Sequence, residues 1–184
     1  GQRRVVRGGG GGEMGEMGWV EALRVKPIFD GFHEGPLEAM DTCARAPLLV
    51  TCSAFDRTVR VWNYRTRRQL ICHCHPGDAT FQPRNVSIHP NGELVLVGLR
   101  GRVVLYHVLQ AEGVLKELEE FTSKGAKAAE FSPGGDRFAL IGLTEVHIFD
   151  TYDRRLACII PDHTGAVTAW GWEADGASFT TAGN

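Results

Sequence analysis

The chain is built from short runs in which apolar and polar residues alternate, separated by turns rich in Pro, Gly, Asn and Asp. Runs such as TVRVWNY, RVVLYHV and EVHIFDT place apolar side chains at every second position, the period of a β-strand with one buried face. Helical three-four spacing is convincing only in VLKELEEF, residues 114–121, which also fits a polar outer strand. The pattern therefore predicts an all-β fold.

The predicted strands recur with a period of about 43 residues. Four segments share a small-residue turn followed by a short apolar run, and these turns are 43, 43 and 41 residues apart, at Pro47, Pro90, Pro133 and Ala174. A second marker is the aromatic residue of the alternating run, which recurs after 44 and 43 residues, at Trp62, Tyr106 and Phe149. Two independent markers thus give the same repeat.

Each repeat resolves into four short strands, which is typical of a β-propeller blade. Leucine-rich repeats are shorter, and helical repeats of this length would show a 3.6-residue period instead. We predict a propeller fragment whose ring is not closed, with about three complete blades and partial blades at each end. The predicted blades are residues 33–74, 84–121, 127–160 and, in part, 163–184, with a stray strand at 23–29.

Domain organisation follows from the same pattern. Residues 1–22 are predicted to be a Gly-rich flexible segment, because their glycines neither follow a strand nor open a helix as a phosphate-binding loop would. Residues 23–184 form the partial propeller, and the remainder of the propeller is needed for ring closure.

The stretch FHEGPLEAMDTCARAPLLVTCSAFDRTVRVWN resembles a WD repeat. His33 stands at the histidine of the family's Gly-His marker, Asp56 at its tight-turn aspartate and Trp62 at its tryptophan. The resemblance implies a buried hydrogen-bond tetrad in which these three join a hydroxyl of the second strand, either Thr51 or Ser53. Such a chain would satisfy every buried polar group and hold the strands together.

The wider succession, including SIHPNGELVLVGLRGRVVLYHVL and HTGAVTAWGWEADG, resembles the propeller region of the cilia- and flagella-associated WD-repeat proteins over roughly residues 23–184. The resemblance implies a non-enzymatic interaction scaffold of the ciliary or flagellar axoneme, which takes part in dynein-arm assembly and ciliary motility. Its partners would be axonemal or dynein-arm components. The alternative is a general WD-repeat adaptor outside cilia, such as a substrate receptor of a ubiquitin ligase.

Composition and charge narrow the classes of partner. The chain is 43% hydrophobic and 23% charged, as an ordinary globular protein is, and its formal net charge is -2. We therefore expect protein partners, no nucleic acid and no membrane, and no cofactor. An odd number of cysteines, and the lack of an apolar run of signal-peptide length, favour a cytoplasmic location.

Arginine is concentrated in two predicted turns between a third and a fourth strand. These are Arg65, Arg67 and Arg68 in the first blade, and Arg154 and Arg155 in the third. Because such turns lie on one face of a propeller, the arginines are a candidate binding face for an acidic partner such as a tubulin tail or a carboxylate-rich helix. The alternative interpretation is a solvated rim.

The stretch QLICHCHPG raises the question of a metal site. Side chains alternate along a strand, so Cys72 and Cys74 face one way while His73 and His75 face the other, and the four cannot bind one tetrahedral ion. We expect buried thiols and half-exposed histidines; a metal-assisted enzyme is the alternative. The remaining cysteines lie in apolar runs and are expected in the core: Cys43, Cys52 and Cys158.

No catalytic residues are predicted. Although His33, Ser53 and Asp56 are the residue types of a nucleophilic triad, the tetrad explains them better. Trp170 and Trp172 share one face of a strand, and we expect them to pack between blades.

Overall fold

The computed structural model describes residues 32–74, 78, 80–122, 125–126, 128–161 and 164–183. The ordered elements of these residues are all strands, so this part of the chain has no helix long and apolar enough to cross a membrane. The predicted all-β fold is confirmed. The segment 1–22 and the strand expected at 23–29 lie outside the described residues.

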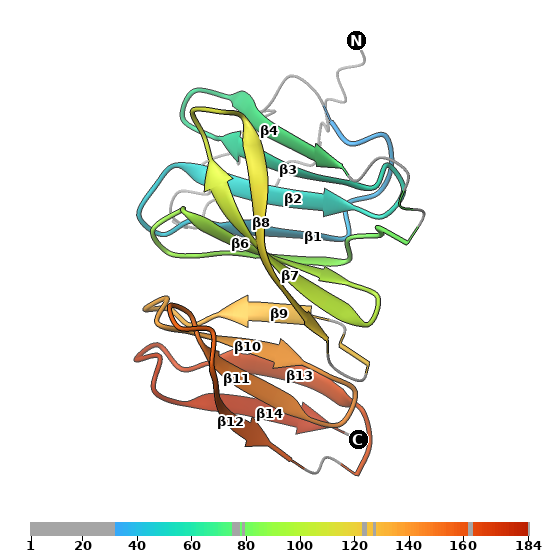
Figure 1. Ribbon diagram of the computed structural model, residues 1–184, viewed down its shortest axis with the longest axis vertical. Coiled ribbons are helices and arrows are strands. Elements are labelled where there is room, and N and C mark those ends of the chain that lie inside the picture. The colour runs from blue at the N-terminus through green and yellow to red at the C-terminus, as the bar shows by residue number, and fades with distance from the viewer. Residues whose placement is uncertain are drawn as a thin grey trace, which may run out of the picture.

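Four antiparallel sheets follow one another along the chain, and we call them blades one to four (Figure 1). Blade one contains β1 (Ala39–Thr42), β2 (Leu48–Ser53), β3 (Thr58–Asn63) and β4 (Arg68–Cys74). Blade two contains β5 (Asn85–Ile88), β6 (Leu94–Leu99), β7 (Arg102–Leu109) and β8 (Val114–Thr122). Blade three contains β9 (Ala128–Phe131), β10 (Arg137–Ile141), β11 (Val146–Asp150) and β12 (Leu156–Ile160). Blade four consists of β13 (Val167–Trp172) and β14 (Phe179–Gly183).

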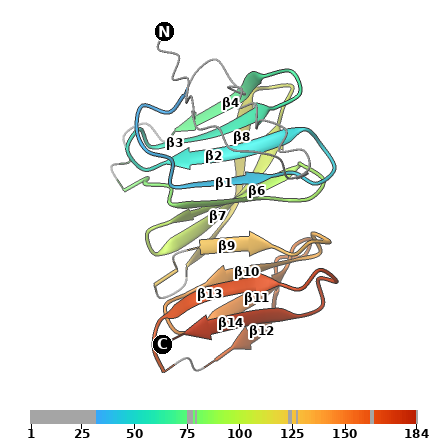
Figure 2. The same cartoon turned by 180° about the vertical axis from the view of Figure 1, so that it is seen from behind.

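The blades are arranged as successive leaves of a propeller. Within each complete blade the strands lie side by side in chain order, and the first strands of neighbouring blades touch, β1 against β5 and β5 against β9. The two views show the sheets succeeding one another from blade one, near the N-terminal end, to blade four (Figures 1 and 2). The four described sheets do not close a ring, as the repeat pattern predicts. The run VLKELEEF is the outer strand β8, not a helix.

Apolar side chains fill the space between blades. One cluster joins blades one and two and includes Val61 and Tyr106, and a second joins blades two and three around Phe138. A third cluster lies between blades three and four, where Trp170 and Trp172 pack in part against it, as the sequence predicts. Burying each large apolar side chain stabilises the fold by about 1.5–3 kcal/mol, so these clusters contribute most of the stability of the contacts between blades.

Side chains of one blade satisfy the axis-facing backbone of the next. The first strand of each blade has a free edge toward the propeller axis, and unpaired N–H groups there would be costly if buried. The bonds are Ile88 N–H to Asp41 Oδ2 (2.8 Å), Ala129 N–H to Asn85 Oδ1 (2.8 Å) and Phe131 N–H to Ser87 Oγ (3.2 Å). Polar residues of the inner strands thus join neighbouring blades by hydrogen bonds, in addition to the packing of the apolar clusters.

The turn after each first strand packs on the turn of the preceding blade. In blade three this turn contains Gly135, whose φ of 82° is in the left-handed region and whose carbonyl accepts a 2.8 Å hydrogen bond from His89 Nε2 in blade two. A β-carbon at Gly135 would overlap the His89 imidazole. Gly92, with φ of 81°, approaches Leu48 of blade one in the same way. Both positions therefore require glycine.

Candidate functional site

The structure brings His33, Thr51, Asp56 and Trp62 into one hydrogen-bonded chain. Trp62 Nε1 donates to Thr51 Oγ1 at 2.8 Å, Thr51 Oγ1 lies 2.8 Å from His33 Nε2, and His33 Nδ1 lies 2.8 Å from Asp56 Oδ2. Ser53 is not in this chain, because its hydroxyl accepts from the Phe55 N–H at 3.3 Å. The chain connects β2, β3, the turn between them and the segment before β1.

The donors and acceptors of this hydrogen-bonded chain determine where the protons of Thr51 and His33 lie. An indole N–H only donates, so the Thr51 hydroxyl accepts from Trp62 and passes its own proton toward His33 Nε2. Nδ1 of His33 then carries the proton and donates to Asp56. Burial lowers the pKa of His33 below its ordinary value of 6.5, although the Asp56 charge raises it in part. The lowered pKa favours the neutral ring.

The Asp56 carboxylate is the acceptor at the end of the chain. Burial alone would raise its pKa, but hydrogen bonds from Thr58 and from the Glu34 N–H hold the pKa below its ordinary value. Thr58 contributes its N–H at 3.0 Å and its hydroxyl at 2.8 Å. Every side-chain polar atom of this hydrogen-bonded chain therefore has a partner. Such an arrangement stabilises the blade and does not activate a nucleophile.

The two arginine-bearing turns lie on the same face of the molecule. The turn after β3 is tied to the turn after β1 by a 3.0 Å bond from Tyr64 N–H to the Pro47 carbonyl, and blade three repeats this link from Thr151 N–H to Asp136 O at 2.9 Å. We call the side chains there the arginine face; it consists of Arg65, Arg67, Arg68, Arg154 and Arg155. All five are exposed.

Two members of the arginine face hold a backbone conformation that favours glycine. Arg67 has φ of 58° and Arg154 has φ of 59°, while Gly113, at the matching place in blade two, has φ of 72°. Asn63 and Asp150 begin these turns and accept two backbone N–H groups each. A non-glycine residue in this region is strained by about 1–2 kcal/mol, so blades one and three keep arginine where glycine would be easier.

Ion pairs occupy only part of the arginine face. Arg154 Nη1 lies 3.2 Å from Glu119 Oε2, and Arg155 Nε lies 4.0 Å from Asp153 Oδ2. Within the described residues, no ion pair involves Arg65, Arg67 or Arg68, the members of the arginine face that belong to blade one. These three side chains are exposed, so a carboxylate of another molecule has access to them.

The cysteine predictions are wrong in part. Cys43 and Cys52 are buried as expected, but Cys72, Cys74 and Cys158 are exposed. Strands β4 and β12 are the outermost strands of their blades, and no described strand covers the side on which these thiols lie. In the part of the chain that the structure describes, no group of three or more His, Cys, Asp or Glu residues is arranged to hold a metal ion.

His73 lies on the opposite face of β4 from the two thiols, as alternation predicts. Its ring packs edge-on against Tyr106 (4.9 Å between centroids) and Phe81 (5.9 Å) in the cluster between blades one and two. His75 lies outside the described residues.

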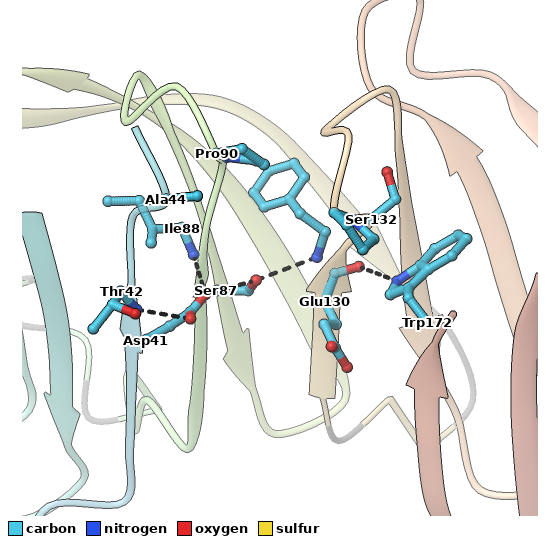
Figure 3. Close-up of a pocket in the computed structure, with 11 residues that line it drawn as sticks. Asp41, Thr42, Ala44, Ser87, Ile88, Pro90, Glu130, Ser132 and Trp172 are labelled. Atoms are coloured by element: carbon cyan, nitrogen blue, oxygen red, sulfur yellow. Dashed lines mark hydrogen bonds between the residues drawn. The ribbon is translucent and has the colours of Figure 1, made fainter. Parts of the chain in front are cut away.

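A pocket near the propeller axis is a feature that sequence reasoning missed. It has a volume of about 300 Å³ and lies where the inner strands of all four blades end (Figure 3). Its polar lining includes Asp41, Ser87 and Glu130, and its apolar lining includes Phe131 and Trp172. The only signal in the sequence is that these polar residues fall in the first strands of their repeats. We call this feature the axial pocket.

Glu130 is the half-buried carboxylate of the axial pocket. Its pKa is raised, first by burial and further by the charge of Asp41, against a lowering by a side-chain hydrogen bond from Trp170. The Trp172 indole N–H donates to the Glu130 carbonyl at 3.4 Å, which places blade four against this side of the pocket (Figure 3).

Comparisons with known proteins agree with this architecture. The family described as WD domain, G-beta repeat matches residues 28–63, the segment that holds the hydrogen-bonded chain. Cilia- and flagella-associated protein 57 of Mus musculus is 31% identical over 168 residues, covering 91% of this chain and 13% of that protein.

Two ciliate proteins show similar likeness. Cilia- and flagella-associated protein 57 C of Tetrahymena thermophila is 29% identical over 164 residues, covering 82% of this chain and 12% of its own length. Cilia- and flagella-associated protein 57 A of the same organism is 28% identical over 162 residues, covering 88% of this chain and 12% of its length. The chain thus spans about an eighth of the length of these relatives.

Proposed function

We propose, from the premise that this chain is a segment of a WD-repeat β-propeller, that it is a non-enzymatic protein-binding scaffold of the cilium or flagellum. The observation that carries the proposal is its 31% identity to a cilia- and flagella-associated protein over 91% of the chain. Strands locked by packing and hydrogen bonds hold loops in fixed positions, and fixed loops bind partners with little loss of entropy. A role in dynein-arm assembly, with axonemal partners, is the finer form of this proposal.

The arginine face supports the binding role. Strain persists in a structure only where something compensates for it, and Arg67 and Arg154 are both strained at positions where blade two has glycine. Their side chains do not pack in the core, so stability does not explain them. We propose that the arginine face contacts an acidic segment of a partner, since guanidinium groups bind carboxylates with two parallel hydrogen bonds.

A binding experiment with a defined acidic probe tests this role. The probe is a fluorescent hexaglutamate peptide, and the variant is Arg67→Gly with Arg154→Gly, which removes two charges at positions where glycine fits the backbone. We expect binding to weaken about two- to thirtyfold, from about 0.2–1 kcal/mol for each of the two exposed charge pairs, and the wild-type affinity to fall in high salt. Anisotropy titrations give the affinities.

The chain offers a matched control. Arg57 is also exposed, with φ of 58°, but it lies in the turn between β2 and β3, at the opposite end of the sheet. Arg57→Gly relieves the same strain and should leave the affinity for the peptide unchanged. If Arg57→Gly, which removes one charge, loses about half the binding free energy that the double variant loses, the peptide senses only net charge, and the arginine face is not the binding site.

A further inference from the structure

The axial pocket has the size and the walls of a receptor for one side chain. Its volume of about 300 Å³ is at the lower end of the range for ligand pockets, too small for a large cofactor. Its apolar lining includes Ile88, Pro90, Pro133 and Trp172. An elongated side chain that is apolar along its stem and polar at its tip would match these walls.

The charges in the axial pocket are negative and only partly compensated. The Asp41 carboxylate accepts three hydrogen bonds, from Thr42 N–H at 2.7 Å, from Ser87 Oγ at 3.1 Å and from Ile88 N–H at 2.8 Å. The Glu130 carboxylate has a side-chain hydrogen bond with Trp170, while the Glu130 backbone carbonyl accepts from Trp172. Among the described residues, no Lys, Arg or His lines the pocket, and none forms an ion pair with Glu130.

We propose that the axial pocket binds an arginine side chain of a partner protein, with the guanidinium paired to Glu130. A half-buried carboxylate beside a second negative charge gains most from a cation, and guanidinium is more weakly hydrated than ammonium, so it enters such a site more easily. Trp172 also lines the pocket, and an aromatic ring beside a guanidinium attracts it by a cation–π contact. Asp41 contributes its field from a position fixed by the inner strands.

The pocket lies on the same side of the molecule as the arginine face. Its lining residues are at the ends of β1, β5, β9 and β13, where the turns after the first strands begin, and those turns are bonded to the arginine-bearing ones. The inference rests on the proposed scaffold function only in taking the ligand to be a protein. The hexaglutamate test does not involve Glu130, so the two proposals fail independently.

The probe for the test is Nα-acetyl-arginine methylamide, with the norleucine and lysine analogues for comparison. Titration into the ¹⁵N-labelled chain is followed at the indole N–H signals of Trp170 and Trp172, while the Trp62 signal reports on the fold. We expect saturable shifts with the arginine analogue, weaker binding of the lysine analogue and no binding of the norleucine analogue. Glu130→Gln should reduce the affinity about tenfold or more, because it removes a charge-assisted pair.

Glu93→Gln is the matched control, since it removes the same charge from an exposed position outside the pocket and should leave the affinity unchanged. An unmoved Trp62 signal in Glu130→Gln shows that the fold is kept. The proposal is overturned if the arginine analogue gives no saturable shift, if the norleucine analogue binds as well, or if Glu130→Gln binds as the wild type does. Displacement of the arginine analogue by millimolar Ca²⁺ would assign the site to a metal ion instead.

Discussion

The Thr51 hydroxyl is the single atom that joins the two halves of the hydrogen-bonded chain in blade one. It accepts from Trp62 and donates to His33, so its removal takes away the hydrogen bond of a buried indole N–H and that of a buried ring nitrogen. Thr51→Val keeps the shape of the side chain and should lower the free energy of unfolding by about 2–4 kcal/mol. Urea denaturation followed by tryptophan fluorescence measures the change.

Ser53 provides the comparison for this prediction. It is buried on the same strand, but its hydroxyl serves only the Phe55 N–H at 3.3 Å. Ser53→Ala should therefore lower the unfolding free energy by only about 0.5–1.5 kcal/mol. A loss as large as that of Thr51→Val would show that the chain of bonds is not organised around Thr51.

His33 makes the stability of the fold dependent on pH. Its pKa is lower in the folded protein than the ordinary 6.5, so between these two values the unfolded chain binds more protons. Stability is therefore fully present above about pH 6.5 and falls as the pH drops through the folded pKa, by up to about 1.4 kcal/mol per pH unit. Asp56, whose pKa is also lowered, adds a further loss below its ordinary 3.8.

Melting temperatures between pH 7.5 and 5.5 test this effect. The wild type should lose stability toward pH 5.5, and His33→Gln, although less stable throughout, should show a flatter dependence. His107→Gln leaves the chain of bonds intact and should keep the wild-type slope. A slope that is the same in all three proteins would assign the pH dependence to other groups.

Sequence reasoning found His33, Asp56 and Trp62 because each has a fixed place in the repeat. It left Thr51 and Ser53 as alternatives, because both carry a hydroxyl and both lie on the same face of one strand. The choice between the two hydroxyls depends on where the Trp62 indole N–H lies, and its position depends on the register of β2 and β3. In this register Trp62 lies opposite Leu49, and its indole reaches along β2 to Thr51.

At the scale of elements, the turns after the first strands connect the blades. Gly135 combines a left-handed backbone with close contact to His89, so Gly135→Ala should lower the unfolding free energy by about 2–4 kcal/mol through strain and overlap together. Gly101 has the same φ of 82° but no atom within 4 Å of an added β-carbon.

Gly101→Ala thus isolates the backbone effect and should cost only about 1 kcal/mol. Denaturation midpoints of the two variants give the difference that belongs to the contact between blades. Equal losses would show that the turn of blade three does not press on His89.

Strand positions were predictable because alternation and the repeat period both mark them. The outer strand β8 shows how the period decides: its local pattern also fits a helix, but its place in the repeat does not. Exposure on outer strands was not predictable in the same way. Cys158 lies in an apolar run, which predicts a buried position. The thiol is nevertheless exposed, because no described outer strand of blade four covers β12 there.

At the scale of the whole molecule, one face carries negative charge near the propeller axis and positive charge farther from it. Carboxylates lie in the axial pocket, where the inner strands meet, and arginines lie on the turns that lead to the outer strands. A partner with both acidic and basic groups would fit this pattern in one orientation only. The axial pocket could not be foreseen from sequence, because Asp41, Ser87, Glu130 and Trp172 come from four separate repeats.

The flanks of the described blades indicate that more propeller is needed. Met40 on β1 is a large apolar residue that stays exposed, and it pairs with Thr51 on the face of blade one that points away from the cluster with blade two. In a closed ring, neighbouring strands cover such positions. The remainder of the propeller therefore stays a prediction of this account, together with the boundaries of its domains.

Proximity labelling in ciliated cells is the most direct test of the claim that this protein is a docking component of the axoneme. A labelling enzyme is fused to the protein expressed from its own gene, and the modified neighbours are identified by mass spectrometry. The account predicts enrichment of axonemal doublet and dynein-arm proteins over a freely diffusing control. Enrichment of cullin adaptors without axonemal proteins would contradict it.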